Sequence, residues 1–388
     1  MQLYLKFKIL WLFLLLSGFL FAGCTHTELL YSKKIDLEGL RLNYNAHMPE
    51  KGPWILGTEF TSSLRDCISV EPNTGMILWK SSDFCLPPEK AGDDVVLFKK
   101  EGLSLTGEFR LVDSASGHET YTGALAGVDF LYENLSRKNG MIFTINSYEI
   151  KAFQENNGML IWKILHRHLS DICDPGNGDF SEFHYSFTDS FLITECLDSV
   201  FVFIDIKTGI PASYFHGLNI YSHDSYANRL YAAKKSGTGL IAFEGTEKIW
   251  SVPLPKNYTI KDLRASEKWI LVQSHTGSGE KMVYRLDVFN ADGKLVNTIL
   301  PVDQFGYLGF IGISKDYMVY FRSSDQYMIL RKLPDGAEKK LMKFTSRLVI
   351  STEAIGALSA QPGDDPLFSS PYIIIPGYED FHVFRINE

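Results

Sequence analysis

A hairpin pattern recurs along this 388-residue chain and constrains its fold more than any other feature. Each copy has a strand of alternating polar and apolar residues, a polar turn that ends in Gly, and a second strand that often contains Trp. In the two clearest copies, residues 68–80 and 150–163, the Trp follows the Gly by four residues. A third copy spans residues 201–209, weaker copies span 111–117, 287–293 and 330–336, and a degenerate copy spans 240–250. Recurrence of this kind predicts a repeat architecture.

Each copy is interpreted as a β-hairpin. Alternation buries one face of a strand, and the turn ends in Gly because that position needs a positive φ angle, which residues with a Cβ rarely adopt. The predicted turn glycines are Gly75, Gly117, Gly158, Gly209, Gly293 and Gly336. The tryptophans Trp79, Trp162 and Trp250 are predicted to dock between neighbouring repeats rather than to bind carbohydrate.

The spacing of the hairpins predicts four strands per repeat. Successive turn glycines, Gly245 included, lie 36 to 51 residues apart, which suits a propeller blade. Apolar segments at residues 54–57, 141–144, 191–194, 269–272 and 317–321 are predicted to be the inner strands. The last pair, residues 372–375 and 381–386, lacks outer strands, so residues 35–43 are predicted to complete this blade and close the ring. We therefore predict an all-β propeller of eight blades, with seven as the alternative because the copy at residues 111–121 is weak.

These hairpins resemble the PQQ-like β-propeller repeat, whose signature is an Ala-x-Asp-x-x-Thr-Gly-x-x-x-Trp hairpin with a docking Trp. Residues 70–79, 152–162 and 204–209 carry the resemblance, which extends over one predicted domain, residues 35–388. The chain departs from the pattern by keeping Trp in three units, while Tyr121 takes the corresponding place in a fourth. The resemblance implies the fold and leaves the function open, since propellers carry out unrelated activities.

The N-terminus has the pattern of a secretory signal. Lys6 and Lys8 precede an apolar run of 14 residues, 9–22. A membrane-spanning helix, the alternative, needs about 20 apolar residues. Residues 20–24 (Leu-Phe-Ala-Gly-Cys) resemble a bacterial lipobox, in which the Cys receives lipid, although Phe21 stands where Leu is usual.

By this resemblance, residues 1–23 are a lipoprotein signal peptide, Cys24 carries acyl chains such as palmitate, and residues 24–34 are a lipidated tether. Thr25 follows where Asp would favour the inner membrane, which implies an outer-membrane lipoprotein. The periplasmic side is expected rather than the cell surface, although the sequence leaves both open. Removal of 23 residues leaves 365 and changes the net charge from −8 to −10. Because no basic run is present, nucleic-acid binding is not expected, and lipid is the predicted contact with the membrane.

Four further cysteines remain: Cys67, Cys85, Cys173 and Cys196. An even number in an oxidising compartment predicts two structural disulfides. Pairing Cys67 with Cys85 would close a hairpin and pairing Cys173 with Cys196 a longer loop, but the sequence leaves the connectivity open. The alternative, a metal or catalytic thiol, has no CxxC motif, vicinal pair or Cys beside His to support it.

Few residues suggest catalysis. Nucleophile, zinc-protease and phosphate-loop motifs are missing from the sequence. Residues 171–182 gather four carboxylates and an amide that would suit calcium, but they lack EF-hand spacing and are interpreted as a surface turn. His166, His168 and His184 lack a fourth zinc ligand and are interpreted as surface residues. The quinone-dependent alcohol dehydrogenases that share the repeat place adjacent cysteines against the quinone, and this chain has none. We predict no cofactor, no metal and no enzymatic activity; a quinone- or calcium-dependent enzyme is the least favoured alternative.

The lipobox, length and repeat type resemble the propeller lipoprotein of the outer-membrane β-barrel assembly complex. The resemblance implies a non-catalytic, monomeric scaffold that binds protein partners at the outer membrane, a β-barrel assembly component among them, through sheet edges and loops. The alternative is an extracytoplasmic module that binds a glycan or small ligand at the propeller mouth. The candidate binding loop spans residues 214–226 and contains Tyr214, Phe215, His216, Tyr221, His223 and Tyr226.

Overall fold

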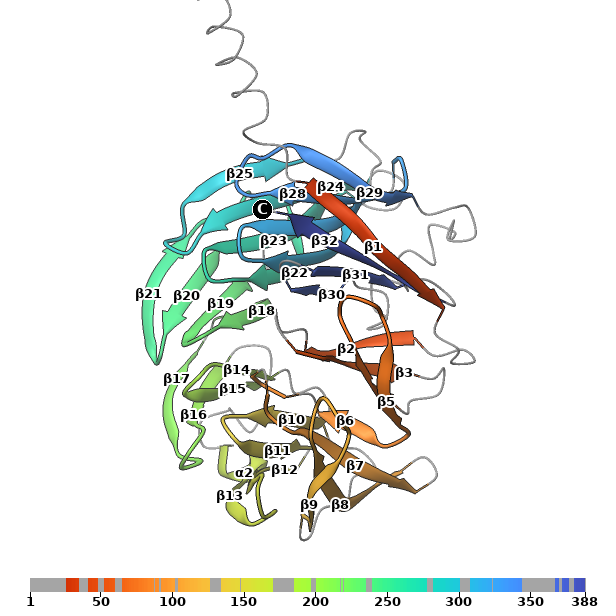
Figure 1. The fold of residues 1–388 in the computed structure, drawn as a ribbon. Helices are drawn as coiled ribbons and strands as arrows, with labels where there is room; N and C mark the ends of the chain where they lie inside the picture. The colour runs from red at the N-terminus through yellow and green to blue at the C-terminus, as the bar shows by residue number, and fades with distance from the viewer. Residues whose placement is uncertain are drawn as a thin grey trace, which may run out of the picture.

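The computed structural model describes residues 26–34, 41–47, 52–59, 65–86, 88–90, 92–101, 104–125, 134–146, 148–169, 185–196, 200–216, 218, 220–234, 239–277, 282–300, 308–322, 324–343, 367–369, 372–376 and 380–387. Within these residues the strands pair into eight four-stranded antiparallel sheets (Figure 1). In the described ranges the one helix is the four-residue α2 (His166–Leu169). The predicted all-β propeller of four-stranded blades is confirmed.

Seven of the described sheets consist of consecutive strands, and one combines strands from both ends of the chain. The first four consecutive sheets are β2 (Arg41–His47), β3 (Trp54–Glu59), β4 (Arg65–Val70) and β5 (Ile77–Ser81); β6 (Phe84–Leu86), β7 (Val95–Glu101), β8 (Ser104–Val112) and β9 (Glu119–Ala124); β10 (Asn134–Lys138), β11 (Met141–Ile145), β12 (Glu149–Gln154) and β13 (Leu160–Leu165); and β14 (Tyr185–Phe187), β15 (Phe191–Cys196), β16 (Val200–Asp205) and β17 (Pro211–Phe215).

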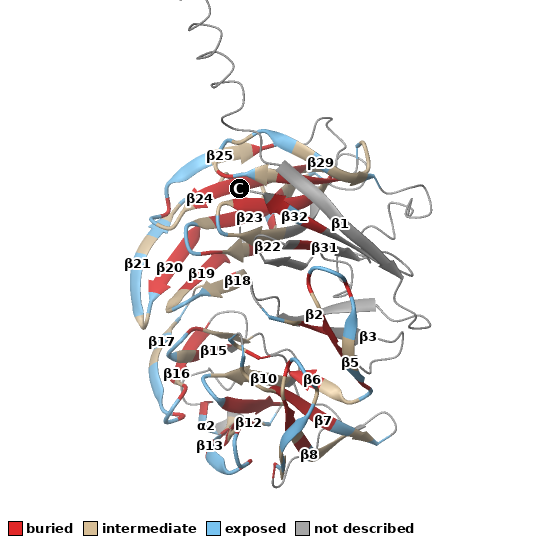
Figure 2. Ribbon diagram, in the orientation of Figure 1, coloured by how far each residue is buried: buried red, intermediate tan, exposed pale blue. Residues whose placement is uncertain are grey.

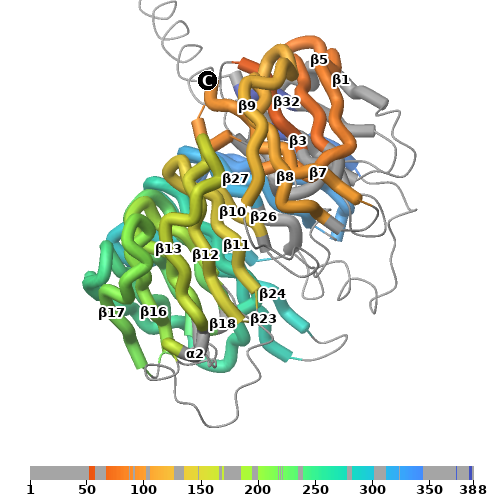
Figure 3. The backbone as a smooth tube through the Cα atoms, turned by 90° about the horizontal axis from the view of Figure 1, so that it is seen from below, coloured from red at the N-terminus to blue at the C-terminus, as the bar shows by residue number. Residues whose placement is uncertain are grey.

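The next three are β18 (Ile220–Tyr226), β19 (Arg229–Lys234), β20 (Leu240–Glu244) and β21 (Glu247–Val252); β22 (Thr259–Ala265), β23 (Trp269–Thr276), β24 (Val283–Asn290) and β25 (Leu295–Ile299); and β26 (Leu308–Ser314), β27 (Tyr317–Arg322), β28 (Tyr327–Lys332) and β29 (Glu338–Lys343). The sheet shared by both ends contains β30 (Leu367–Ser369), β31 (Tyr372–Pro376), β32 (Asp380–Asn387) and β1 (His26–Lys34). Seen from below, the sheets of β6–β9, β10–β13 and β14–β17 follow one another side by side (Figure 3).

The apolar segments expected as inner strands are in fact the second strands of their sheets. They correspond to β3, β11, β15, β23 and β27, and a further strand begins each of these sheets. Two of these first strands were missed because they are polar or short: β10 has the sequence Asn-Leu-Ser-Arg-Lys, and β14 has three residues. Their pairing with a stronger neighbouring strand, rather than their own composition, places them in the sheet.

The N-terminal strand is also displaced from its expected place. Strand β1 pairs with β32 from His26 opposite Asn387 to Lys34 opposite Asp380, so residues 26–34 are part of a sheet and not a tether. Residues 35–43 were expected in this position, but Asn43 lies in β2. Without β1, β32 would be an edge strand with unpaired N–H and C=O groups, which even a polar segment can satisfy. The predicted signal peptide and Cys24 lie outside the described residues.

The core lies between neighbouring sheets. Phe143 and Trp162 of the β10–β13 sheet share one buried cluster with Leu192, Val202 and Ile204 of the β14–β17 sheet. Similar clusters join each sheet to the next, from β2–β5 to the sheet of both chain ends. Figure 2 shows buried residues along the middle strands and exposed residues along β13, β17, β21 and β25. Each outer strand therefore has one neighbour in its sheet and one edge without a paired strand.

The turns between third and fourth strands follow the predicted chemistry with one exception. Asp205 Oδ1 accepts hydrogen bonds from the backbone N–H groups of Lys207 and Thr208, at 3.0 and 2.8 Å, and Gly209 follows with a φ of 69°. Burial raises the pKa of Asp205, but the hydrogen bonds from Thr208 and Lys207 lower it further, so this pKa lies below its ordinary value. The other turn glycines with a positive φ are Gly75, Gly117, Gly158, Gly245 and Gly293.

Gly336 is the exception, because it lacks the positive φ that was predicted for it. A Cβ built on Gly336 would lie 2.5 Å from the carbonyl oxygen of Lys332. Gly is needed here because the backbone approaches closely, and not because of its φ angle.

Candidate interaction surface

Three tryptophans connect consecutive sheets through hydrogen bonds. The indole Nε1–H of Trp79 donates to the carbonyl of Ser114 at 3.0 Å, and that of Trp162 donates to the carbonyl of Ile206 at 2.7 Å. Trp250 donates in the same way to the carbonyl of Ala291, at 3.1 Å. Each Trp lies on the fourth strand of its sheet, and each acceptor lies in a turn of the next sheet. The structure thus places all three between neighbouring repeats, where docking residues were expected.

The same turns hold a glycine against each indole ring. A Cβ built on Gly117 would lie 2.7 Å from the Trp79 ring, and one on Gly209 would lie 2.5 Å from the Trp162 ring. On Gly293 the Cβ would lie 2.9 Å from Trp250. Real Cβ atoms do not approach ring carbons this closely, so the indole occupies the space that a side chain on the glycine would need.

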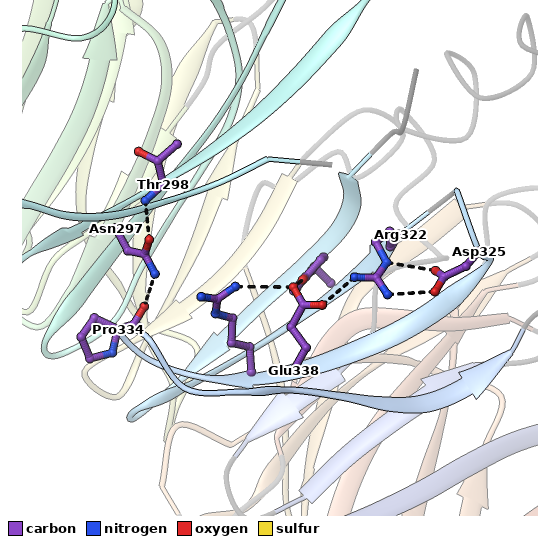
Figure 4. A network of polar contacts seen from close by, with 8 residues as sticks. Asn297, Thr298, Arg322, Asp325, Pro334 and Glu338 are labelled. Carbon is purple, nitrogen blue, oxygen red and sulfur yellow. Dashed lines mark hydrogen bonds and ion pairs between the residues drawn. The ribbon is translucent and has the colours of Figure 1, made fainter. Parts of the chain in front are cut away.

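Sequence reasoning missed a fourth connection of this kind. Asn297, on β25, donates from Nδ2 to the carbonyl of Pro334 in the turn between β28 and β29, at 2.6 Å (Figure 4). Its own Oδ1 accepts the backbone N–H of Thr298 at 2.7 Å, which orients the amide. Asn297 follows Gly293 by four residues, the same spacing that separates Gly75 from Trp79. This spacing from the turn glycine is the sequence signal that could have identified Asn297 as a docking residue.

A polar network stabilises the sheet that receives Asn297. The guanidinium of Arg322 donates to both carboxylate oxygens of Asp325, at 3.0 and 2.8 Å, and to Glu338 at 2.5 Å (Figure 4). Glu338 also accepts the hydroxyl of Tyr320 and pairs with Arg331 at 3.4 Å. The bond to Arg322 is the main reason that the pKa of Asp325 lies well below its usual range. The network joins β27, β28 and β29.

Exposed apolar side chains collect on the outer strands and the turns that precede them. Met76, Met159 and Ile210 each follow a turn glycine directly and are 55%, 59% and 63% exposed. We call this set, with its neighbours on the same strands, the outer apolar surface: Met76, Ile77, Met159, Leu160, Ile161, Ile210, Tyr214, Ile249, Leu295 and Val296. Single exposed apolar residues are ordinary, but here they occupy equivalent places on several sheets, with up to three consecutive apolar residues exposed at 159–161.

Polar contacts join the first strands of neighbouring sheets. Asp224 on β18 accepts the backbone N–H of Ala265, on β22, at 2.7 Å, and that of Ser225 at 2.8 Å. Burial raises the pKa of Asp224 to about 6, against the effect of these donors and of Arg264. Ser225 in turn donates from Oγ to the carbonyl of Phe187 on β14 at 2.6 Å. Strands β14, β18 and β22 are therefore tied together.

Residues 214–226 do not form the expected binding loop, since most of them belong to β17 and β18. Phe215 packs against Phe203 and Phe243, with ring centroids 5.7 and 4.8 Å apart, and His223 Nδ1 lies 2.5 Å from Ser186 Oγ. Of the expected binding residues, Tyr214 and Tyr226 are 52% and 44% exposed, and His216 is also exposed. The side chain of Tyr221 lies outside the described set. The mixture of aromatic and polar residues in 214–226 suggested a loop, but it is the alternation of two strands.

Cys67 on β4 and Cys85 on β6 lie in one buried cluster that joins the first two consecutive sheets. Cys85 is a buried thiol in this structure. Cys173 and the side chain of Cys196 lie outside the described residues. The expected pairing of Cys85 is therefore not formed in this structure, and the pairing of Cys173 with Cys196 stays a prediction.

The structure bears on one of the two metal hypotheses. His166 and His168, two of the three histidines considered for zinc, lie in the short helix α2. Residues 171–182 and His184 lie outside the described part of the chain. Among the side chains that are described, no group of three or more His, Cys, Asp or Glu is arranged to hold a metal. Nor does a helix in the described part have the length and apolar character to cross a membrane.

Searches against family models and curated proteins found no match. Solved structures do match. BamB from Moraxella catarrhalis is similar at a TM-score of 0.54 and 12% identity, over 93% of this chain and 100% of that chain. The computationally designed protein Ika8 is similar at 0.58 and 13%, over 92% and 100%. A quinohemoprotein alcohol dehydrogenase from Comamonas testosteroni is similar at 0.57 and 10%, over 95% and 78%. At these identities the likeness shows the fold alone, in agreement with the β-propeller of four-stranded sheets described above.

Proposed function

We propose that this chain is a non-catalytic, lipid-anchored scaffold that binds protein partners at the outer membrane of a bacterial cell, on the periplasmic side. The observation that carries the proposal is the outer apolar surface, in which Met76, Met159 and Ile210 are each more than half exposed. Covering such side chains with a partner removes apolar area from water, which favours association.

The hairpins that display these residues are well held. Gly209 donates its N–H to the carbonyl of Asp205 at 2.9 Å, and the indole of Trp162 packs on the same glycine. Ile210, the next residue, is thus presented by a turn that both its own sheet and the preceding sheet fix. A preorganised surface loses less conformational entropy when it binds, so these turns suit recognition.

Two resemblances support the outer-membrane part of the proposal. Residues 20–24 resemble a lipobox that ends in Cys24, and the fold is similar to that of BamB at 12% identity. In this proposal Cys24 carries the lipid, and the propeller binds a component of the machinery that assembles outer-membrane β-barrels. The proposal assigns no catalytic step and no cofactor to the chain.

The test is co-purification of the full chain, tagged at its C-terminus, from detergent-solubilised bacterial membranes, followed by mass spectrometry. We expect an outer-membrane β-barrel protein and its assembly lipoproteins to be recovered. The double variant Met159→Lys, Ile210→Lys should not recover these partners, because it places two charges on the outer apolar surface. Neither substitution replaces a buried side chain.

Asn156→Lys is the matched control, since Asn156 is exposed in the turn that precedes Met159 and contributes no apolar surface. It should retain the partners. Recovery of the folded chain alone, or equal recovery with the double variant, would contradict the scaffold proposal and favour a module that binds a glycan or small ligand.

A further inference from the structure

We infer that Lys261, His275 and Tyr284 form a binding site for a small oxyanion, a phosphate or carboxylate group, at one end of the β22–β25 sheet. The site goes beyond the scaffold function and does not depend on it. Its three residues come from three adjacent strands, β22, β23 and β24.

The backbone brings these side chains together. His275 pairs directly with Tyr284 on β24 and with Thr259 on β22, so His275 and Tyr284 lie on the same face of the sheet. The register of β22 shifts between Ile260 and Asp262, which places Lys261 in a β-bulge. A bulge interrupts the alternation of a strand and redirects the side chain that it contains.

Tyr284 is the common neighbour of the other two residues. The ring centroids of His275 and Tyr284 are 5.7 Å apart, and the Nζ of Lys261 lies 5.4 Å from the centre of the Tyr284 ring. The Lys261 ammonium and the His275 imidazole therefore both lie close to one aromatic ring.

The imidazole has a buried atom that lacks a partner. Nδ1 of His275 is shielded from solvent and makes no hydrogen bond in the structure. Buried polar atoms are nearly always paired, and one without a partner weakens the fold unless a ligand or water satisfies it. Because imidazole nitrogens can donate, an oxygen acceptor bound beside His275 would satisfy this atom.

The local charge favours an anion. Burial lowers the pKa of Lys261 to about 8, so this side chain is still mostly an ammonium at pH 7. Burial and then the Lys261 charge lower the pKa of His275, which is therefore neutral at that pH. The neighbouring Asp262, whose negative charge raises the pKa of Lys261, also accepts a hydrogen bond from Arg264 at 3.0 Å. A bound oxyanion would interact with the Lys261 ammonium, and a cationic ligand would be repelled by it.

The test is an NMR titration of the full chain in neutral detergent, with labelled histidine rings. The His275 signal is assigned by its loss in His275→Gln, and the exposed His118 is the internal control. The pKa of His275 is measured in inorganic phosphate and in sodium chloride of equal ionic strength, which matches screening. We expect phosphate to raise this pKa by about half a unit or more, because an anion stabilises the imidazolium.

Lys261→Met separates the site from a nonspecific effect. In chloride this variant should raise the pKa of His275, because a neighbouring positive charge is removed, and in phosphate it should abolish the further rise. A parallel titration with bicelles that contain phosphatidylglycerol distinguishes sources: a shift with bicelles alone assigns the oxyanion to a lipid headgroup, and a shift with inorganic phosphate assigns it to a soluble anion. No anion-dependent shift in either arm, or an equal shift in Lys261→Met, would overturn the inference.

Discussion

Each docking Trp lies against a turn glycine of the next sheet. The packing of the indole ring therefore depends on the backbone conformation of that glycine. At Gly209 the φ angle is 69° and a Cβ would meet the Trp162 ring at 2.5 Å. Gly140 has nearly the same φ angle, 70°, but no heavy atom lies within 4 Å of its Cβ position. A comparison of substitutions at Gly140 and Gly209 therefore distinguishes the effect of the positive φ angle from the effect of the contact with the Trp162 ring.

Gly140→Ala should lower the free energy of unfolding by about 1 kcal/mol, the typical effect of a left-handed conformation in a residue with a Cβ. Gly209→Ala should lower it by about 3 kcal/mol, because the methyl group also displaces the indole from its place between two sheets. Urea unfolding followed by Trp fluorescence measures both. Equal losses would show that the ring contact contributes nothing.

Asn297 should behave as a docking residue although it is not aromatic. Asn297→Asp replaces the amide that donates to the Pro334 carbonyl with a carboxylate that cannot donate, and we expect a loss of about 2 kcal/mol. Asn156→Asp, at an exposed turn position, is the control for the charge change. If both variants unfold at the same urea concentration, the Asn297 bond does not stabilise the junction.

At the scale of one sheet, β26–β29 depends on charged groups that are largely removed from water. The side chain of Arg322 is 9% exposed and contacts Asp325 and Glu338 together. Lys99 and Glu108 on the β6–β9 sheet pair at 2.9 Å, but both are more than half exposed. Burial rather than distance distinguishes the two cases.

Arg322→Met should destabilise the protein by about 3 kcal/mol at pH 7, because it removes the buried cation that contacts both carboxylates and leaves Asp325 with Lys340 and Glu338 with Arg331. Lys99→Met should leave the unfolding midpoint unchanged. Since the pKa of Asp325 is lower in the folded chain, the stabilisation is present above the ordinary carboxyl pKa of about 3.9 and is lost as pH falls below it. The difference between wild type and Arg322→Met should therefore shrink toward pH 3; a constant difference would exclude an ionic origin.

Asp224 should give the opposite pH dependence. Its pKa is raised to about 6, so the folded chain binds a proton more tightly than the unfolded chain does. The resulting stabilisation is complete below about pH 3.9 and is lost as pH rises through 6. Unfolding measured at pH 4 to 7 should show the wild type losing at least about 1 kcal/mol relative to Asp224→Asn across this interval. Parallel curves would contradict a titrating Asp224 at the β18–β22 junction.

In the sheets made of consecutive strands, the sequence predicts the third and fourth strands well because the turns between them carry chemical markers. Asp205 and Gly209 mark the turn between β16 and β17. Trp162 marks β13, the fourth strand of the preceding sheet. First strands such as β10 have no marker, and β1 pairs with a strand more than 300 residues away, which no local pattern reports. The Lys261 cluster was missed for a similar reason, since a bulge and not strand alternation places its lysine.

At the scale of the whole molecule, the two ends of the chain meet in one sheet. Strand β1 begins at His26, two residues after Cys24. A lipid on Cys24 would therefore hold this sheet close to the membrane surface, without the flexible tether that the polar sequence suggested. The outer apolar surface lies on other sheets, from β5 to β25, and so would be available to a partner.

The most direct test of the scaffold proposal is site-specific photo-crosslinking in living cells. A photoreactive amino acid is placed at Met159 or Ile210 in the outer apolar surface, or at the exposed Asn156 as the control. We predict that the two apolar positions crosslink to the same outer-membrane assembly protein and that Asn156 does not. Absence of crosslinks from Met159 and Ile210 in a folded, membrane-bound chain, or equal crosslinking from Asn156, would contradict the account.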